Sequence, residues 1–209
     1  MSTFVGIVDY GMGNINSVDN ALNYLGIDHH IVSHTQEIAS CSHLIIPGVG
    51  AYHEAMSNLN RNNLCDAITK HTDAKKPLLG ICLGMQILSD TGEEMGESMG
   101  LGFIPGKVQL LQLADKNLPI PHIGWNSLEF HRLHPILTGV KKHVDFYFVH
   151  SYFFNADNEQ DVLATTEYGK KFPAIIAREN IVGIQFHPEK SQDNGLLLIE
   201  NFCEWDGQC

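Results

Sequence analysis

The sequence is poor in positive charge, and it has no long apolar run and no closely spaced pair of cysteines. Each of these absences argues against one class of protein. Its 209 residues hold 13 Lys and Arg against 24 Asp and Glu, which gives a formal net charge of −11. No basic cluster interrupts this acidic balance, so we expect no nucleic-acid partner and no membrane partner. No apolar run approaches the length of a membrane-spanning helix.

The cysteines are few, odd in number and far apart along the chain. They are Cys41, Cys65, Cys82, Cys203 and Cys209. A scattered, odd set without a Cys-x-x-Cys pair favours neither a disulfide framework nor a structural zinc site. The amino-terminal residues also lack the basic and apolar stretches of a signal peptide. Together these features predict a cytoplasmic protein.

Metal and cofactor signals are weak throughout. Histidine is abundant, with 12 copies, but the clusters at residues 29–30 and 131–134 have no carboxylate or cysteine at ligand spacing. The glycine-rich loop at residues 9–14 has two glycines and lacks the third glycine of a dinucleotide fingerprint. We therefore expect packed or solvated histidines, a tight turn in this loop, no metal and no cofactor.

The first 90 residues alternate short apolar runs with patterns of helical spacing. Runs of strand length occupy residues 4–8, 28–32, 43–46 and 78–81. Helical spacing occupies residues 18–25, 52–59 and 64–71, and a further helix opens at residue 83. This alternation predicts an α/β protein with a parallel sheet that helices cover on both faces.

Beyond residue 90 the pattern changes to short strand-like runs. After a polar loop at residues 91–100, these runs occupy residues 107–111, 127–130, 146–154, 162–168, 174–177 and 181–186. They predict a small antiparallel portion added to the parallel core, and residues 195–205 predict a closing helix. Because no repeat, linker or low-complexity tract divides the chain, we expect one domain over residues 1–209.

A cysteine flanked by glycines stands where a strand gives way to a helix, in the sequence GICLGMQ at residues 80–86. This is the pattern of a nucleophile elbow, a sharp turn at which only Gly80 and Gly84 leave strand and helix room to approach. The amino end of a helix favours a thiolate at Cys82, and the Leu83 N–H can hold an oxyanion. Taken alone, the stretch also fits a buried structural cysteine.

A histidine and a glutamate follow the last strand-like run, in the sequence HPE at residues 187–189. The residue before a proline is biased to an extended conformation, in which residues two apart point the same way. Glu189 can then hold one nitrogen of the His187 imidazole and leave the other free to take a thiol proton. A lone HPE is usually a strand-end turn, but a glycine-flanked cysteine at another strand end favours a catalytic group.

The sequence PGVG at residues 47–50 follows the third strand-like run. Glycines at the carboxyl end of a parallel strand let backbone N–H groups point into a site without side chains in the way. This segment can therefore supply a second oxyanion donor, although a simple turn into the next helix is the alternative.

These motifs together resemble those of the class I glutamine amidotransferases, which use a Cys-His-Glu triad. The resemblance rests on GICLGMQ at 80–86, GIQFHPE at 183–189 and PGVG at 47–50. DYGMGN at 9–14 and PHIGWN at 121–126 narrow it to the glutaminase subunits of imidazole glycerol phosphate synthases. The resemblance covers residues 4 to 205 and implies a flavodoxin-like, three-layer sandwich.

The resemblance implies an enzyme that hydrolyses L-glutamine to L-glutamate and ammonia. Cys82 would form a γ-glutamyl thioester, His187 would be the general acid and base, and Glu189 would orient it. Backbone groups of Gly48, Val49, Gly50 and Leu83 would hold the oxyanion. The amino-acid end of glutamine would be held by Gln86, Glu94, Ser151 and Tyr152.

The resemblance also implies a partner, a (β/α)₈-barrel cyclase that forms a heterodimer with the glutaminase and receives the ammonia through a protein channel for histidine biosynthesis. The residues expected at the interface or the ammonia exit are Asn14, Asn16, His122, Ile123, Trp125 and Lys190. For Trp125, ordinary core packing is the alternative.

The sequence departs from the family pattern at residues 121–123, where PHI replaces the usual Pro-Gln-Met. The departure leaves open a paralogous glutaminase that supplies ammonia for amidination of a bacterial surface sugar. Outside the family, the alternatives are a γ-glutamyl hydrolase or cysteine peptidase, a degenerate scaffold and a flavodoxin-like binding module. Glu189 and Gln86 favour glutamine, the intact triad argues against a scaffold, and the poor loop at 9–14 argues against the binding module.

Overall fold

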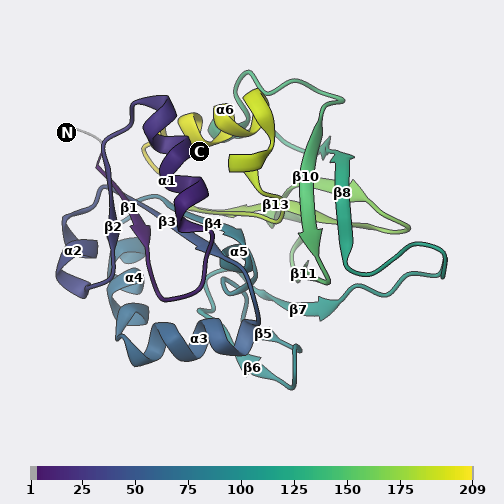
Figure 1. The fold of residues 1–209 in the computed structure, drawn as a ribbon, viewed down its shortest axis with the longest axis horizontal. Coiled ribbons are helices and arrows are strands. Elements are labelled where there is room, and N and C mark those ends of the chain that lie inside the picture. The colour runs from purple at the N-terminus through teal and green to yellow at the C-terminus, as the bar shows by residue number, and fades with distance from the viewer. Residues whose placement is uncertain (1–3, 209) are drawn as a thin grey trace.

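The structure is a computed structural model that describes residues 4–208. Cys209 and residues 1–3 lie outside this range, so the expectations for Cys209 and for the amino-terminal end are not tested by it. Helices pack against both faces of a central sheet, which makes three layers (Figure 1). The predicted three-layer α/β fold is confirmed.

The central sheet has eight strands in the order β2-β1-β3-β4-β14-β13-β12-β9. Its parallel strands are β1 (Val5–Val8), β2 (His29–Val32), β3 (His43–Gly48), β4 (Leu78–Cys82) and β14 (Ile181–Ile184). Its antiparallel strands are β13 (Lys171–Arg178), β12 (Val162–Glu167) and β9 (Glu129–Phe130). Part of the predicted change of pattern after residue 90 is therefore a change of strand direction within this sheet, at β13, β12 and β9.

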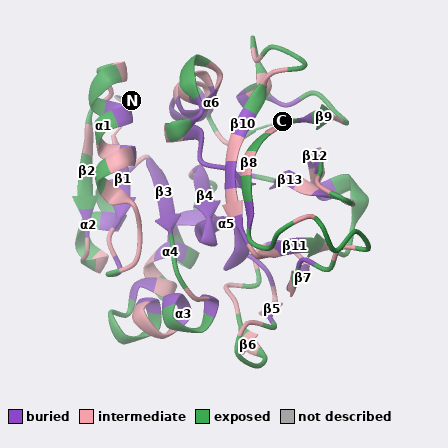
Figure 2. Cartoon of the chain, turned by 45° about the vertical axis from the view of Figure 1, so that its right-hand side comes forward, coloured by how far each residue is buried: buried purple, intermediate pink, exposed green. Residues whose placement is uncertain are grey.

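The strands at the centre of this sheet are apolar because both of their faces are covered. Every residue of β1, β3, β4 and β14 is buried, and Figure 2 shows β3 and β4 as the buried middle of the molecule. Such strands read as continuous apolar runs, without the alternation of a half-exposed strand. Their shared direction brings the carboxyl ends of β3, β4 and β14 to one edge.

Two groups of helices cover the two faces of the sheet. The α1 helix (Ile15–Leu25) and the α6 helix (Gln192–Glu204) pack into one hydrophobic cluster. On the other face lie α2 (Thr35–Ser40), α3 (Tyr52–Arg61), α4 (Leu64–Asp73) and the short α5 (Leu83–Gln86). The α1 helix ends at Gly26, whose left-handed φ of 69° suits glycine.

The sequence did not predict α2. The helix has six residues and buries only Ile38, so it is too short to show a helical period. It is needed because β2 and β3 lie on either side of β1, and a parallel crossover between them must pass over the sheet. Glu37 begins the helix by accepting a hydrogen bond from the His34 N–H at 3.0 Å.

Two smaller sheets lie beside the central one. They show that two of the predicted strands are each divided into two separate strands. One pairs β8 (His122–Ser127) with β10 (Asp145–His150), and the other joins β11 (Tyr152–Ala156), β7 (Gly106–Leu110), β5 (Thr91–Gly92) and β6 (Ser98–Met99). The run at 146–154 is therefore two strands, because the chain changes sheets at Ser151. The run at 127–130 is likewise divided between β8 and β9. Single 3₁₀ turns are η1 (Pro135–Leu137), η2 (Glu159–Asp161) and η3 (Pro188–Lys190).

No helix within residues 4–208 is both long and apolar enough to cross a membrane. In the same range, no cluster of three or more His, Cys, Asp or Glu side chains has the arrangement of a metal site.

Candidate active site

Cys82 occupies a strained turn between β4 and α5. Its φ of 55° and ψ of −110° lie outside the regions that residues other than glycine ordinarily adopt. A Cβ atom on Gly84 would lie 1.8 Å from the Ile46 carbonyl oxygen, and one on Gly80 would lie 2.4 Å from the Gly84 oxygen. The two glycines thus permit the close packing that the predicted elbow requires.

Two groups contact the Cys82 sulfur in this turn. Its Sγ lies 3.8 Å from the Val149 carbonyl oxygen, which can accept the thiol proton in a hydrogen bond. The Gln185 Nε2 also lies 3.8 Å from the Sγ atom, on a side chain that is fully buried. The pairing of Ile184 with Ile81 explains this contact, because it puts the next residue of each strand at the same level.

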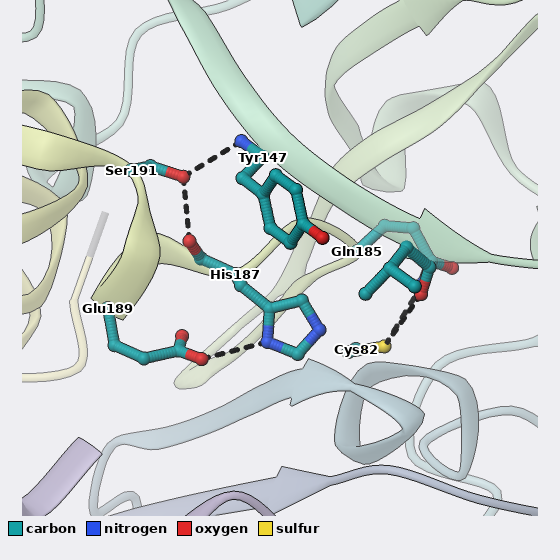
Figure 3. A network of polar contacts seen from close by, with 7 residues as sticks. Cys82, Tyr147, Gln185, His187, Glu189 and Ser191 are labelled. Atoms are coloured by element: carbon teal, nitrogen blue, oxygen red, sulfur yellow. Dashed lines mark hydrogen bonds and ion pairs between the residues drawn. The ribbon is translucent and has the colours of Figure 1, made fainter. Parts of the chain in front are cut away.

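His187 and Glu189 form a buried pair beside Cys82. The His187 Nδ1 lies 2.8 Å from the Glu189 Oε1, and both side chains are at most 2 % exposed. The His187 ring stands between the carboxylate and the cysteine, with its Nε2 edge toward the sulfur (Figure 3). Nε2 has no hydrogen-bond partner among residues 4–208.

The backbone forms this pair differently from the sequence prediction. The β14 strand ends at Ile184, and Glu189 belongs to the 3₁₀ turn η3 instead of an extended segment. Only His187, with φ −98° and ψ 95°, keeps the extended conformation that a following proline favours. The turn brings the carboxylate back to the ring, so the predicted contact exists although its expected geometry was wrong.

The protonation of His187 follows from its two neighbours. Burial alone would lower the pKa of His187, but interaction with Cys82 and with the Glu189 carboxylate raises the pKa to about 9. An imidazolium is therefore the main form of His187 at neutral pH. Its ring edge toward the Cys82 sulfur therefore carries a proton that it can donate.

A backbone network fixes the position of His187. The His187 N–H donates to the Tyr147 carbonyl oxygen at 2.9 Å, and the Ser191 hydroxyl donates to the His187 carbonyl oxygen at 2.6 Å. The Tyr147 N–H closes the ring by donating to the Ser191 Oγ at 3.0 Å (Figure 3). This network ties His187 to β10.

The cysteine opens into a cavity of about 230 Å³ at the carboxyl edge of the sheet. Eight of the residues predicted from the sequence line it: Val49, Gly50, Cys82, Leu83, Gln86, Glu94, Ser151 and Tyr152. Val149 and His150 complete the wall. Gly48 pairs with Cys82 in the β3–β4 ladder. A volume below the ~300 Å³ of drug-sized pockets suits a ligand as small as an amino acid.

Glu94 and Gln86 are held in place at this cavity. The Glu94 Oε2 accepts a hydrogen bond from the Tyr52 N–H at 2.8 Å, at the first residue of α3. The Gln86 Nε2 donates to the Tyr152 carbonyl oxygen at 3.0 Å and to the Gln185 Oε1 at 3.2 Å. Both side chains therefore present a fixed polar group to a ligand.

A larger cavity of about 650 Å³ lies between α2 and α4. It contains none of the predicted site residues and no cysteine, and its lining residues are Thr35, Gln36, Ala39, Asn63, Asp66, Ala67, Lys70, His71, Ala74 and Lys76. The smaller cavity is the candidate site because it is lined by Cys82, whose sulfur the His187 ring faces.

The residues predicted at a partner surface divide into exposed and buried ones. Ile123 and Trp125 on β8 are 58 % and 46 % exposed, so Trp125 is not a core residue. Asn16 and Lys190 are exposed and Asn14 is half-buried. His122 has a fully buried side chain, so its place beside an ammonia exit stays a prediction. Alternate residues of a strand face opposite sides, and His122 falls on the inner side of β8.

Sequence reasoning missed five residues of the site: Tyr147, Val149, His150, Gln185 and Ser191. Gln185 carried a usable signal, because it is a polar residue at the end of an apolar run and lies two positions before His187. Val149 and Tyr147 act through backbone atoms, which no side-chain pattern reveals. Ser191 acts through its hydroxyl, and its role depends on a turn that was predicted as extended.

The comparisons with known proteins agree with this geometry. The family model described as glutamine amidotransferase class-I matches residues 6–204. The HisH 2 subunit of imidazole glycerol phosphate synthase from Nitrobacter winogradskyi is 44% identical over 208 residues, 97% of this chain and 98% of that protein. The HisH subunit from Aquifex aeolicus is 48% identical over 197 residues, 94% of each chain.

Solved structures support the fold. The structure of PurLQS from Thermotoga maritima has a TM-score of 0.76 at 17% identity, covering 98% of this chain and 99% of that chain. A crystal structure of a glutamine amidotransferase has a TM-score of 0.71 at 22% identity, covering 95% and 98%. The family model and the two relatives, each matching nearly the whole chain, decide the assignment. The chain belongs to the class I glutamine amidotransferases and, within them, to the family of the HisH subunits of imidazole glycerol phosphate synthase.

Proposed function

We propose that this chain hydrolyses L-glutamine to L-glutamate and ammonia, as the glutaminase subunit of an imidazole glycerol phosphate synthase. The observation that carries the proposal is the buried His187–Glu189 pair, joined at 2.8 Å, with the free edge of the ring toward the Cys82 sulfur. Identities of 44% and 48% to two HisH subunits over nearly the whole chain support the same conclusion.

The first half of the reaction uses the charge pair of Cys82 and His187. The thiolate attacks the side-chain carboxamide carbon of glutamine, and the C–O double bond becomes an oxyanion. The Leu83 N–H and the backbone of residues 48–50 are the proposed donors to this oxyanion. When the intermediate collapses, the C–N bond breaks and His187 gives its proton to the departing nitrogen, which leaves as ammonia.

The second half returns the enzyme to its starting state. His187 is now neutral and takes a proton from water, whose oxygen attacks the γ-glutamyl thioester carbon. The C–S bond breaks, glutamate leaves, and Cys82 is again a thiolate beside an imidazolium. Glu189 keeps the imidazole in the tautomer that both halves need.

The other cavity residues are proposed to select glutamine. The Glu94 carboxylate is an acceptor for the substrate α-ammonium group, since a charged acceptor forms the stronger hydrogen bond with a cation. Gln86, Ser151 and Tyr152 offer polar groups to the remaining amino-acid atoms. A peptide substrate would not need these contacts, so they favour glutamine over a peptidase substrate.

The partner is proposed to be a (β/α)₈-barrel cyclase that docks on the outer face of β8 as a heterodimer. Ile123 and Trp125 form an exposed apolar surface there, and Trp125 packs against Tyr147 at a ring distance of 5.7 Å. A large aromatic side chain is typical of an interface hot spot. Ammonia needs such a covered route because in neutral water it is mostly protonated and no longer nucleophilic.

We further infer one catalytic domain over residues 1–209 in a reducing cytoplasm. The family model spans residues 6–204 without a break, which supports the single domain. Cys41, Cys65, Cys82 and Cys203 are all free thiols, which supports the compartment.

The decisive experiment measures glutamate release by the chain mixed with a histidine-pathway cyclase, with and without the nucleotide substrate of the cyclase. Strong stimulation by the nucleotide supports both the chemistry and the partner. Hydrolysis without stimulation would support the glutaminase activity but favour a partner from the pathway of surface-sugar amidination. Hydrolysis of γ-glutamyl peptides without free ammonia would instead indicate a peptidase.

Replacing the nucleophile separates the two activities of the complex. Cys82→Ser should abolish synthesis from glutamine and leave synthesis from added ammonium salt intact, because the cyclase needs only the ammonia. Cys65→Ser, a change at a half-buried cysteine outside the cavity, is the matched control. Loss of the ammonia-dependent synthesis in an assembled Cys82→Ser complex would contradict the assignment.

A further inference from the structure

Gln185 is a polar side chain that the proposed mechanism does not use. It follows an apolar strand, is fully buried, and has its backbone N–H bonded to the Ala174 carbonyl oxygen at 2.9 Å. A buried amide costs free energy unless its hydrogen bonds are satisfied. The partners of this amide therefore indicate what it does.

The orientation of the Gln185 amide follows from a chain of hydrogen bonds that begins at the Tyr152 carbonyl oxygen and passes through Gln86. The Gln86 amide must turn its Nε2 toward the Tyr152 carbonyl oxygen, because that oxygen can only accept. The same Nε2 lies 3.2 Å from the Gln185 amide, so the Gln185 atom that faces it must be the acceptor Oε1. The donor Nε2 of Gln185 is then left pointing at Cys82, 3.8 Å from Sγ.

The sulfur of Cys82 thus has an acceptor on one side and a donor on the other. The Val149 carbonyl oxygen suits the thiol, since it accepts the S–H proton, whereas the Gln185 N–H suits the thiolate. In the charge pair, whose proton is on the His187 Nε2 and not on Sγ, the contact with Val149 has no hydrogen and the contact with Gln185 is a charge-assisted hydrogen bond.

We propose that Gln185 takes part in the reaction by donating a hydrogen bond from its side-chain amide to the Cys82 thiolate. The amide is locked by Gln86, which lines the substrate cavity, so a single chain of amides joins the cavity wall to the nucleophile. This inference rests on the proposed function, because it assigns a step of the same reaction.

A purely structural role for Gln185 makes different predictions. In that case the amide would only buttress Gln86, and its loss would weaken glutamine binding without changing the reactivity of the sulfur. The two roles are separated by measuring the sulfur directly, without any substrate.

The test is the pH dependence of Cys82 alkylation by iodoacetamide in the full chain, followed by mass spectrometry of the Cys82 peptide. Gln185→Met keeps the size of the side chain and removes the donor. We expect the half-maximal pH of alkylation to rise by about one unit and the rate at neutral pH to fall about tenfold, equivalent to about 1.4 kcal/mol. The kcat for glutamine should fall with little change in KM.

Two further variants keep the test decisive. Gln185→Glu has the same shape and places negative charge beside the thiolate, so its shift should be larger than that of Gln185→Met. If Gln185→Met does not fold, as judged by its thermal transition, this variant answers the question. Gln160→Met, at an exposed glutamine in η2, is the matched control and should leave the profile unchanged.

Alkylation profiles that superpose for the wild type, Gln185→Met and Gln185→Glu would overturn the proposal, and a rise in KM alone would assign Gln185 to binding. The alkylation assay uses no glutamine, so it stays informative if the chain proves not to hydrolyse glutamine. A chain that does not hydrolyse glutamine would refute the proposed function, whatever the alkylation profiles show.

Discussion

Two buried side-chain pairs in this molecule each contain a histidine and differ in what that histidine contacts. His187 pairs with the Glu189 carboxylate, whereas His150 pairs with another imidazole, its Nε2 lying 3.0 Å from the His122 Nδ1. Exposure is 2 % for His187 and 5 % for His150. Burial lowers the pKa of His150 to about 4, but Cys82 and Glu189 outweigh burial and raise the pKa of His187 to about 9.

The difference teaches that burial does not decide the charge of a histidine in this site. The carboxylate and the sulfur make His187 an acid at neutral pH, whereas the His122–His150 pair stays neutral and serves to pack. His122 stacks on Tyr168 at a ring distance of 4.0 Å and also contacts Phe148. One pair is arranged for proton transfer and the other for holding β8 against β10.

The largest expected effect on glutaminase activity comes from removing the negative charge that distinguishes the His187–Glu189 pair from the His122–His150 pair. Glu189→Gln removes the negative charge but keeps the shape, so the pKa of His187 should fall toward that of His150. We expect kcat for glutamine to fall by roughly 10³- to 10⁴-fold, as when the orienting acid of a hydrolase triad is neutralised. Steady-state glutaminase assays test this, with Glu159→Gln at an exposed position as control. A fall of less than tenfold would show that the carboxylate does not set the charge.

A smaller effect should appear in the stability of the wild type across pH. The raised pKa of His187 stabilises the fold fully below its unfolded value of 6.5, and this contribution is lost as the pH rises through about 9. The loss should reach at most about 3 kcal/mol of unfolding free energy. Denaturant unfolding at pH 6 and pH 9.5 measures it, and the loss should shrink in Glu189→Gln.

The lowered pKa of His150 should act in the opposite direction and in a different window. The unfolded chain binds a proton at His150 below pH 6.5 but the folded chain only near pH 4, so stability falls as the pH falls between these values. His71 and His134, whose pKa values burial also lowers to about 4, contribute in the same window. The acid-side slope should therefore decrease in His150→Asn without vanishing. An unchanged slope would mean that His150 is already protonated in the fold.

The smallest expected effect comes from a substitution of His122, and it tests whether this residue serves only to pack β8 against β10. His122→Gln should cost about 1 kcal/mol of unfolding free energy through the lost ring stacking, and change kcat for glutamine less than threefold. Thermal unfolding and glutaminase assays measure the two quantities. His30→Gln, at an exposed histidine, is the control. A large fall in kcat would place His122 in the reaction and not in the packing.

The sequence predicted the parallel half of the fold well because its strands are short apolar runs between helices. It predicted Cys82, His187 and Glu189 as one group because strand-end positions are readable from local motifs. The helix α2 and the split at Ser151 could not be read in this way. They depend on which sheet a segment joins, and that is decided by contacts far away in the sequence.

The site residues that escaped prediction share a different cause. Val149 and Tyr147 contribute backbone atoms, which no pattern of side chains reveals. The His187–Glu189 contact was expected for the wrong geometric reason, since a 3₁₀ turn and not an extended strand forms it. A motif can thus specify which groups meet without specifying the backbone that brings them together.

The β8–β10 ribbon extends from the wall of the cavity to the outer surface of the molecule. Val149, whose carbonyl lies beside the Cys82 sulfur, is paired across the ribbon with Ile123, which is exposed on the outer surface. A single cross-strand pair of residues therefore joins the surroundings of the sulfur to the exposed surface. Ammonia that follows this pair of residues would emerge at the surface where the partner is proposed to dock.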